Sequence, residues 1–342
     1  MILIFRMNAI VEKQQLLDKI KISDFEPSYW AQTGLQQTIM AYCLPYNPMI
    51  DNQTLEHVLL EDGDKIVIAL NFPKPSIKPK RVVLLIHGLS GTYLSKYMIR
   101  LTQRLTQSGM IVARMNLRGC GPGKFHAKKL YHAGTSPDAR MVLQWLAKRY
   151  PQLATTCIGF SLGANISLKL GGESGFDNGN LDSLVAISPP LDLYSCVKLL
   201  AKPPNKFLDK RFAQELVMEV TTLHQFLGTS VPNFPQDLSV YDFDEFYTAP
   251  QNGFQDAKDY YTQSSALPFI EHIKLPTFIL YAKNDPIIFT RNFKYIPRKP
   301  NIDLLITESG GHVGWVNKTN WQGIRWMDNA IEKWIKWFEE NQ

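Results

Sequence analysis

Apolar residues fall into short blocks along the middle of the chain, and these blocks predict buried strands separated by amphipathic helices. Residues 81–86 form a continuous apolar run after Arg81, which is typical of a strand buried on both faces of a sheet. Similar runs predict strands over residues 110–116, 155–159, 184–188, 277–282 and 303–307. Between the first two strands, helical spacing links Leu94, Met98, Leu101 and Leu105, and Gly109 is placed to end that helix.

Further helices are predicted between the later strands. Ser136-Pro137 is typical of an N-cap followed by proline at the first helical position, and predicts a helix through Tyr150. Another helix is expected over residues 164–170. Apolar residues at three- and four-residue steps predict a final helix through Ile324, Met327, Ile331, Trp334, Ile335 and Phe338. This alternation predicts an α/β fold with a mostly parallel, twisted sheet and helices on both faces.

A hairpin near the N-terminus and a long segment in the second half of the chain depart from the alternation. In addition, residues 30–44 fit no regular element. Residues 55–60 and 65–71, joined by Glu61-Asp62-Gly63-Asp64, predict a β-hairpin with an Asp-Gly turn. Residues 189–275 are rich in Phe and Tyr and too long for a plain connection in a compact domain. We interpret them as a largely helical cap inserted into a single domain that spans residues 1–342.

The main chemical signal is the run Gly159-Phe160-Ser161-Leu162-Gly163, which lies between a predicted strand and a predicted helix. A serine nucleophile in this context sits on a sharp turn, so its neighbours two residues away must lack side chains. The helix that follows directs its N-terminal dipole at the developing charge. We therefore predict that Ser161 is a nucleophile rather than an inert turn residue.

A serine nucleophile needs a base and an acid that orients the base. The histidines available are His57, His87, His126, His132, His224, His272 and His312. On this fold the order is nucleophile, acid, histidine, which favours His312, in a glycine-rich loop after the strand at 303–307. The acid is expected to be Asp285, with Asp192 as its competitor.

The tetrahedral intermediate of ester cleavage also needs hydrogen-bond donors for its oxyanion. One is expected to be the backbone N–H of Leu162, directly after the nucleophile. The second is expected in the loop His87-Gly88-Leu89-Ser90-Gly91, where we favour the N–H of Leu89. His87 precedes Ser161 in the chain and is interpreted as a residue that shapes this loop.

Four segments together resemble the YheT-like branch of the α/β-hydrolases (AB hydrolase 4 family). They are 87–91, Asn116-Leu117-Arg118-Gly119-Cys120, Leu130-Tyr131-His132-Ala133-Gly134 and 159–165. The resemblance covers the chain from Trp30 onward, and it implies the α/β-hydrolase fold, activity of carboxylesterases or lipid acyl hydrolases, and the triad Ser161, Asp285 and His312. It also implies an Asn-Pro-His-Leu-Gln-Thr-like segment, of which residues 32–38 keep only part.

Composition adds limits on compartment and partners. The chain is 45% hydrophobic with a net charge of +6, and no long basic run suggests a nucleic-acid partner. Cys43, Cys120, Cys157 and Cys196 form no CxxC pair or zinc-like spacing, which fits a reducing compartment. The apolar run at 1–5 is too short for a signal peptide, and no stretch approaches the ~20 apolar residues of a membrane span. We expect a cytoplasmic protein that needs no metal or organic cofactor.

Arg118 and two of the C-terminal tryptophans each allow two interpretations. Arg118 could pair with a carboxylate such as Asp138 or contact an acidic substrate group, and His132 lies in the next loop. Five tryptophans fall in the last 28 residues: Trp315, Trp321, Trp326, Trp334 and Trp337. Trp334 fits the helix stripe, whereas Trp326 and Trp337 lie off it and could pack internally or touch a membrane surface. We favour internal packing.

Three functions fit these observations. The first is a serine esterase acting on a small-molecule or lipid-like ester through Ser161, His312 and Asp285. The second keeps the acyl-enzyme but passes the acyl group to an alcohol or lipid. The third is a hydrolase-like scaffold that only binds a partner, against which the complete triad argues. Neither the ester nor the oligomeric state follows from the sequence.

Overall fold

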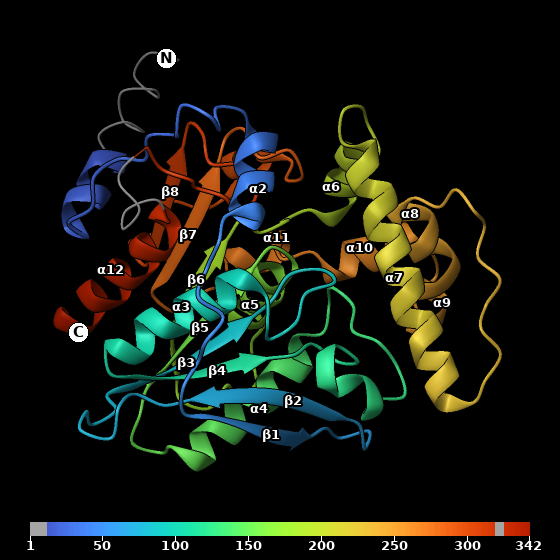
Figure 1. Ribbon diagram of the computed structural model, residues 1–342, viewed down its shortest axis with the longest axis horizontal. Helices are drawn as coiled ribbons and strands as arrows, with labels where there is room; N and C mark the ends of the chain where they lie inside the picture. Colours follow the sequence, from blue (N-terminus) through green and yellow to red (C-terminus); the bar gives the residue numbers. More distant parts are fainter. Residues whose placement is uncertain (1–11, 319–324) are drawn as a thin grey trace.

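The central feature of the fold is one twisted sheet. The computed structural model describes residues 12–318 and 325–342. Eight strands lie in the order β1-β2-β4-β3-β5-β6-β7-β8 (Figure 1). They are β1 (Gln53–Leu59), β2 (Lys65–Asn71), β3 (Arg81–Ile86), β4 (Met110–Met115), β5 (Thr155–Phe160), β6 (Leu181–Ile187), β7 (Thr277–Ala282) and β8 (Ile302–Thr307). Strand β2 runs antiparallel to the other seven strands, which are parallel to one another, so the predicted mostly parallel sheet is confirmed.

The hairpin prediction is also confirmed. Strands β1 and β2 pair along their whole length, from Gln53 opposite Asn71 to Leu59 opposite Lys65. Gly63 in the connection has a φ of +87°, a left-handed conformation that glycine adopts at no steric cost.

Alternating strand residues feed two apolar layers, one on each face of the sheet. In β3, Val82, Leu84 and Ile86 join the layer covered by α4 (Ser136–Arg149) and α5 (Leu162–Gly172). Val83 and Leu85 point to the other face, under α3 (Lys96–Gln107), α12 (Trp326–Glu340) and the helical residues 12–19. This is the period of two expected of a strand, and it explains why these runs contain no polar position.

The segment between β6 and β7 is largely helical. It contains α6 (Leu193–Leu200), α7 (Lys206–Leu227), α8 (Val240–Phe243), the π-helix η2 (Asp244–Thr248), α9 (Ala249–Gln251), α10 (Ala257–Ser264) and α11 (Leu267–Ile270). Helices α6 to α10 lie together at one end of the molecule, and α7 is the longest of them (Figure 1). Leu200, Leu208, Leu216, Val220 and Phe243 give this end its own apolar cluster.

The structure corrects two local details. Residues 34–43, for which the sequence predicts no regular element, form helix α2 (Gly34–Cys43), which begins with a reciprocal capping box between Thr33 and Gln36. Helix α4 is capped at Thr135, not Ser136, whose hydroxyl instead donates to Glu173. Short 3₁₀ turns complete the fold at η1 (Gly121–Phe125) and η3 (Thr290–Tyr295).

The C-terminal tryptophans that the structure describes pack internally, which agrees with the favoured interpretation. Trp326 and Trp334 are buried in the layer under α12, and the indole N–H of Trp326 donates to the Ser23 carbonyl oxygen at 2.9 Å. Trp337 packs partly against the same layer, with the Lys19 ammonium 3.8 Å from its ring centre. Trp321 and Ile324, like the apolar run at 1–5, lie outside the described residues.

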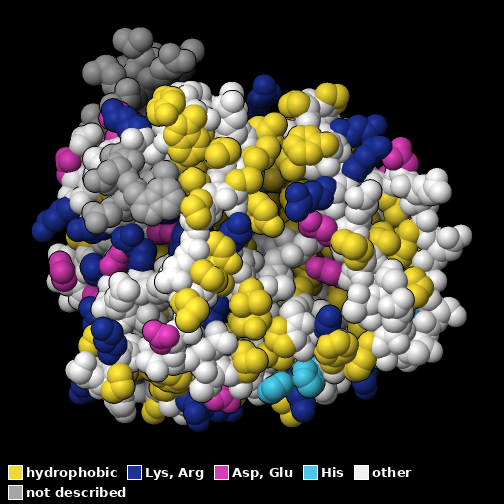
Figure 2. Space-filling model, viewed as in Figure 1, with side chains coloured by type: hydrophobic (Ala, Val, Ile, Leu, Met, Phe, Trp, Pro, Cys, Tyr) yellow, Lys and Arg dark blue, Asp and Glu magenta, His cyan; other side chains and the backbone are white. Residues whose placement is uncertain are grey.

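The surface charges are mixed. On the face drawn in Figure 2, Lys and Arg side chains are interspersed with Asp and Glu. Within residues 12–318 and 325–342, no helix combines the length and apolar character needed to cross a membrane.

Candidate active site

Ser161 stands on a strained turn between β5 and α5. Its φ of 51° and ψ of −119° are unusual for any residue other than glycine. A Cβ atom on Gly159 would lie 2.2 Å from the Gly163 carbonyl oxygen, and one on Gly163 would lie 2.4 Å from the Ile86 oxygen. The two glycines are therefore required by close backbone contacts, as the sequence pattern predicted.

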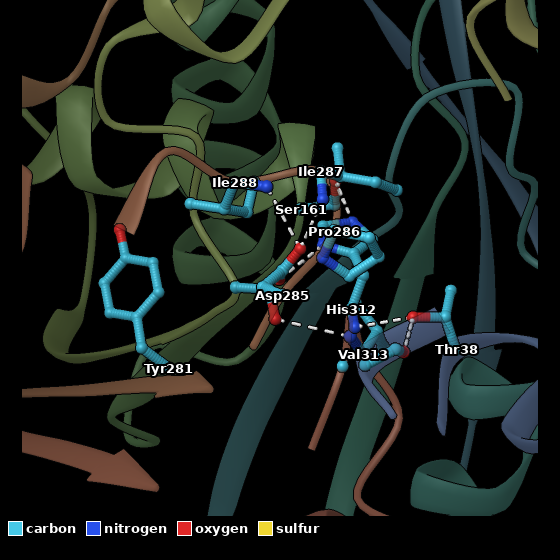
Figure 3. Close-up of polar contacts among 12 residues, drawn as sticks. Thr38, Ser161, Tyr281, Asp285, Pro286, Ile287, Ile288, His312 and Val313 are labelled. Atoms are coloured by element: carbon cyan, nitrogen blue, oxygen red, sulfur yellow. Dashed lines mark hydrogen bonds and ion pairs between the residues drawn. The ribbon is translucent and has the colours of Figure 1, made fainter. Parts of the chain in front are cut away.

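His312 hydrogen-bonds this serine through one ring nitrogen and Asp285 through the other. The Ser161 hydroxyl is 2.8 Å from His312 Nε2, and His312 Nδ1 is 2.9 Å from Asp285 Oδ2 (Figure 3). The three residues come from the ends of β5, β7 and β8, which adjoin the same edge of the sheet. The arrangement could let His312 accept the serine proton while Asp285 holds the imidazole.

The Asp285 carboxylate is held by its own loop. Its Oδ1 accepts the backbone N–H groups of Ile287 and Ile288 at 2.8 and 3.0 Å, which leaves Oδ2 for His312 (Figure 3). The competitor Asp192 has another place in the fold. It caps α6, where Oδ1 accepts the Ser195 N–H and Oδ2 accepts the Ser195 hydroxyl.

Helix α2 supports the His312 loop, which sequence reasoning missed. The His312 N–H donates to Thr38 Oγ1 at 2.8 Å (Figure 3). Gln37 is completely buried, donating to the Ala31 and Val316 carbonyl oxygens and accepting the Val316 N–H. A capping box at Thr33-x-x-Gln36 was the available signal for this helix. Residues 32–38 thus position the loop although they depart from the family pattern.

The loop after β3 passes directly beside Ser161. A Cβ atom on Gly88 would lie 3.1 Å from the Ser161 Cβ. His87 is buried, accepts the Leu117 N–H at Nε2 and hydrogen-bonds the Gly88 oxygen through Nδ1. Burial lowers the pKa of His87 to about 4, so the ring is neutral near pH 7. These contacts fit the expected loop-shaping role.

Two tyrosines hold the backbone on either side of Leu89. The Gly88 N–H donates to the Tyr97 hydroxyl at 3.0 Å, and the Ser90 N–H donates to the Tyr131 hydroxyl at 2.8 Å. Within the described chain, the N–H groups of Leu89 and Leu162 have no acceptor. Both residues line the same cavity as Ser161, so two unpaired donors are available near its hydroxyl.

A cavity of about 320 Å³ lies over the serine and is lined mainly by apolar side chains. Ser161, His312, Leu89 and Leu162 form one wall. Other lining residues come from the segment between β6 and β7 and include Leu200, Phe212, Leu216, Leu223, Val240 and Phe243. The space suits an extended apolar group attached to a reacting carbonyl.

His132 also lines the cavity but is not part of the hydrogen-bonded chain. Its Nδ1 accepts the Gly134 N–H, and its ring lies edge-on to Phe254 and Tyr260. Burial, with nearby Lys129 and Arg118, lowers the pKa of His132 to about 4. The ring is therefore neutral near pH 7.

Arg118 is engaged by three carboxylates. It donates twice to Asp138, at 2.9 and 2.7 Å, and also to Asp64 and Asp62. Burial alone would lower the pKa of Arg118, but its hydrogen bonds to these carboxylates raise it above the ordinary value. The pairing interpretation therefore agrees with the structure, and Arg118 is not among the residues lining the cavity.

Replacing Arg118 by methionine is expected to destabilise the fold by about 3–5 kcal/mol, because buried Asp64 and Asp138 lose their cationic partner. Urea unfolding should show the loss, and Arg118→Lys should recover part of it by keeping the charge. A variant with unchanged unfolding free energy but a selective loss of activity would instead indicate substrate contact.

Comparison with known proteins agrees with this architecture. Residues 81–318 match the family model described as the alpha/beta hydrolase fold. The chain is 31% identical over 291 residues to the putative esterase YheT of Escherichia coli K12, covering 82% of this chain and 84% of that protein. The chain therefore belongs to the α/β-hydrolase family, in its YheT-like branch.

Other α/β-hydrolase relatives carry names of ester- and lipid-active enzymes. The chain is 28% identical to the monoacylglycerol lipase of Saccharomyces cerevisiae, covering 76% of this chain and 60% of that protein. It is 21% identical to human phospholipase ABHD3, covering 91% of this chain and 78% of that protein. Among solved structures, Pyrococcus furiosus esterase Pf2001 superposes with a TM-score of 0.55 at 16% identity, covering 87% of this chain and 99% of that one. That likeness shows the shared fold.

Proposed function

We propose that this α/β hydrolase is a serine esterase that cleaves carboxylic esters through an acyl-enzyme. The observation that carries the proposal is the continuous hydrogen-bonded chain from Ser161 through His312 to Asp285. Ser161 acts as nucleophile, His312 as general base and then acid, and Asp285 as the group that orients the imidazole.

The reaction proceeds in two halves. His312 Nε2 takes the hydroxyl proton as Ser161 Oγ attacks the ester carbonyl, and the N–H groups of Leu89 and Leu162 stabilise the oxyanion. The tetrahedral intermediate then collapses, and His312 returns the proton to the departing alcohol. Water, activated by the same imidazole, attacks the acyl-enzyme and releases the carboxylic acid.

The cavity and the names of the relatives support a substrate class. Segment 189–275 serves as a cap on the single domain, and its apolar wall accommodates a medium-length acyl chain. Relatives named esterase, monoacylglycerol lipase and phospholipase support a lipid-like ester. We also infer a reducing, cytoplasmic setting, because all four cysteines are free thiols.

A fluorophosphonate probe tests the nucleophile directly. The folded protein is expected to be labelled at Ser161, as located by peptide mass spectrometry, and heat-unfolded protein should not be labelled. A parallel series of p-nitrophenyl esters from acetate to palmitate should show a maximum at intermediate chain length. Labelling at another serine, or absence of labelling in folded protein, would contradict the proposal and favour a binding role.

Acyl transfer to an alcohol is the second candidate. A yeast relative, 28% identical over 286 residues, is named medium-chain fatty acid ethyl ester synthase/esterase 2. The mainly apolar cavity could favour an alcohol over water as acyl acceptor. Adding ethanol during turnover and separating acid from ethyl ester would distinguish the two outcomes.

A further inference from the structure

Glu219 is an unexplained acidic residue on the cavity wall. It lies on α7 and lines the same cavity as Ser161. The other α7 residues on that wall are mostly apolar: Phe212, Leu216, Leu223, His224 and Leu227. A carboxyl group in such a wall loses hydration and needs a compensating partner.

One oxygen of the Glu219 carboxyl group lacks such a partner within the described residues. Its Oε2 is shielded from solvent and makes no hydrogen bond there. Two other polar residues that line the cavity, Asp244 and His224, differ from it in this respect. Asp244 accepts the Tyr261 hydroxyl at 2.6 Å, and His224 contacts the Tyr247 and Thr229 hydroxyls.

Glu219 is also close to the turn that carries the proposed oxyanion donor. Its carboxyl group interacts with the Tyr131 hydroxyl, which accepts the Ser90 N–H. Tyr131 therefore connects the Glu219 carboxyl group to the turn that carries Leu89, while the part of the cavity lined by Leu200, Val240 and Phe243 is apolar.

The protonation state fixes what such a group can bind. Burial raises the pKa of Glu219 to about 8, although the Tyr131 hydroxyl opposes the rise. The neutral acid that predominates near pH 7 can donate one hydrogen bond and accept others. A hydroxyl group matches this pattern because it also donates one bond and accepts others.

We propose that Glu219 binds a hydroxyl group on the alcohol portion of the ester, so that the enzyme selects esters of hydroxylated alcohols. The alcohol portion is favoured over the acyl chain because the apolar part of the cavity, lined by Leu200, Val240 and Phe243, suits the acyl chain. This inference rests on the proposed esterase function and names its substrate class more closely.

A matched pair of substrates tests this selectivity. The 2-hydroxyethyl and n-propyl esters of octanoic acid differ by a hydroxyl in place of a methyl group, and kcat/KM is measured from released octanoate. We expect the wild-type enzyme to favour the hydroxyethyl ester at least about tenfold, since a site built for a hydroxyl rejects the analogue without it. Glu219→Leu should bring the ratio near one, whereas Glu219→Gln should retain most of it by keeping a donor and an acceptor.

Controls separate this inference from the esterase proposal. Glu215→Gln removes one charge a turn earlier on α7, where Glu215 pairs with Arg211, and should leave the ratio as in wild type. Fluorophosphonate labelling of Ser161 in each variant reports the nucleophile independently, and thermal unfolding reports folding. An unchanged ratio in labelled, folded Glu219→Leu would overturn the role of Glu219. A wild-type preference for the ester octanoylcholine over both of these esters would overturn it in favour of a cation site.

Discussion

Ser161→Ala is expected to lower kcat/KM for a p-nitrophenyl ester by at least about 10⁴-fold, because no acyl-enzyme can form without the hydroxyl. The fold should tolerate the change. The Ser161 hydroxyl hydrogen-bonds only His312 among the described residues, and the strained turn is held by Gly159, Gly163 and the Ser161 N–H bond to Ile187. The loss of kcat/KM is measured from the nitrophenol released by the purified variant, after the preparation has been checked for wild-type contamination.

Ser188→Ala provides a matched control. Ser188 follows the neighbouring strand β6, also has a positive φ, and its hydroxyl accepts the Val313 N–H at 3.3 Å. It contacts the same histidine loop without touching the hydrogen-bonded chain, so its loss of rate should be far smaller. If Ser161→Ala kept substantial esterase activity, the acyl-enzyme mechanism would be wrong.

The sequence predicted those parts of the fold whose cause is local. Strand β3 was recognisable because Val82 to Ile86 are apolar on both faces, as burial in a parallel sheet requires. The turn at Ser161 was recognisable because close backbone contacts exclude side chains at Gly159 and Gly163. Chain order then brought Asp285 and His312 into consideration before any geometry was known.

Other features could not be predicted because their partners are distant in the chain. The His312 loop is held by Thr38, which lies 274 residues earlier. The Leu89 N–H has no acceptor, whereas the hydroxyls of Tyr97 and Tyr131 accept the N–H groups of Gly88 and Ser90 on either side of it. Only the folded loop shows that arrangement. Aromatic composition indicated that segment 189–275 is unusual, but it could not indicate that Glu219 faces the cavity.

Trp326 shows the same limit for packing. Helical spacing placed it off the apolar stripe of α12 and left its environment open. In the fold it is buried because Phe25 covers its ring at 5.6 Å between centroids and the Ser23 carbonyl oxygen accepts its indole N–H. The N-terminal segment supplies both contacts, so periodicity within α12 alone could not have predicted them.

Asp285→Asn is expected to reduce kcat by about 10⁴-fold while leaving the fold intact. The backbone N–H groups of Ile287 and Ile288 need an oxygen acceptor, so the amide oxygen must take the position of Oδ1. The amide nitrogen then faces His312 Nδ1 and donates to it. This places the imidazole proton on Nε2, where the ring cannot accept the proton of Ser161.

The Asp192→Asn variant makes this prediction specific to the orienting role. Asp192 was the competing acid, and it caps α6 through Ser195. Asparagine ranks beside aspartate as an N-cap, so this variant should keep both its stability and its rate. Steady-state kinetics with thermal unfolding of both variants decides the assignment.

A loss of rate in Asp192→Asn that matched or exceeded the loss in Asp285→Asn would move the acid to Asp192. Equal, near-wild-type rates in both variants would show that neither carboxylate orients the histidine, since the wrong imidazole tautomer cannot support proton transfer.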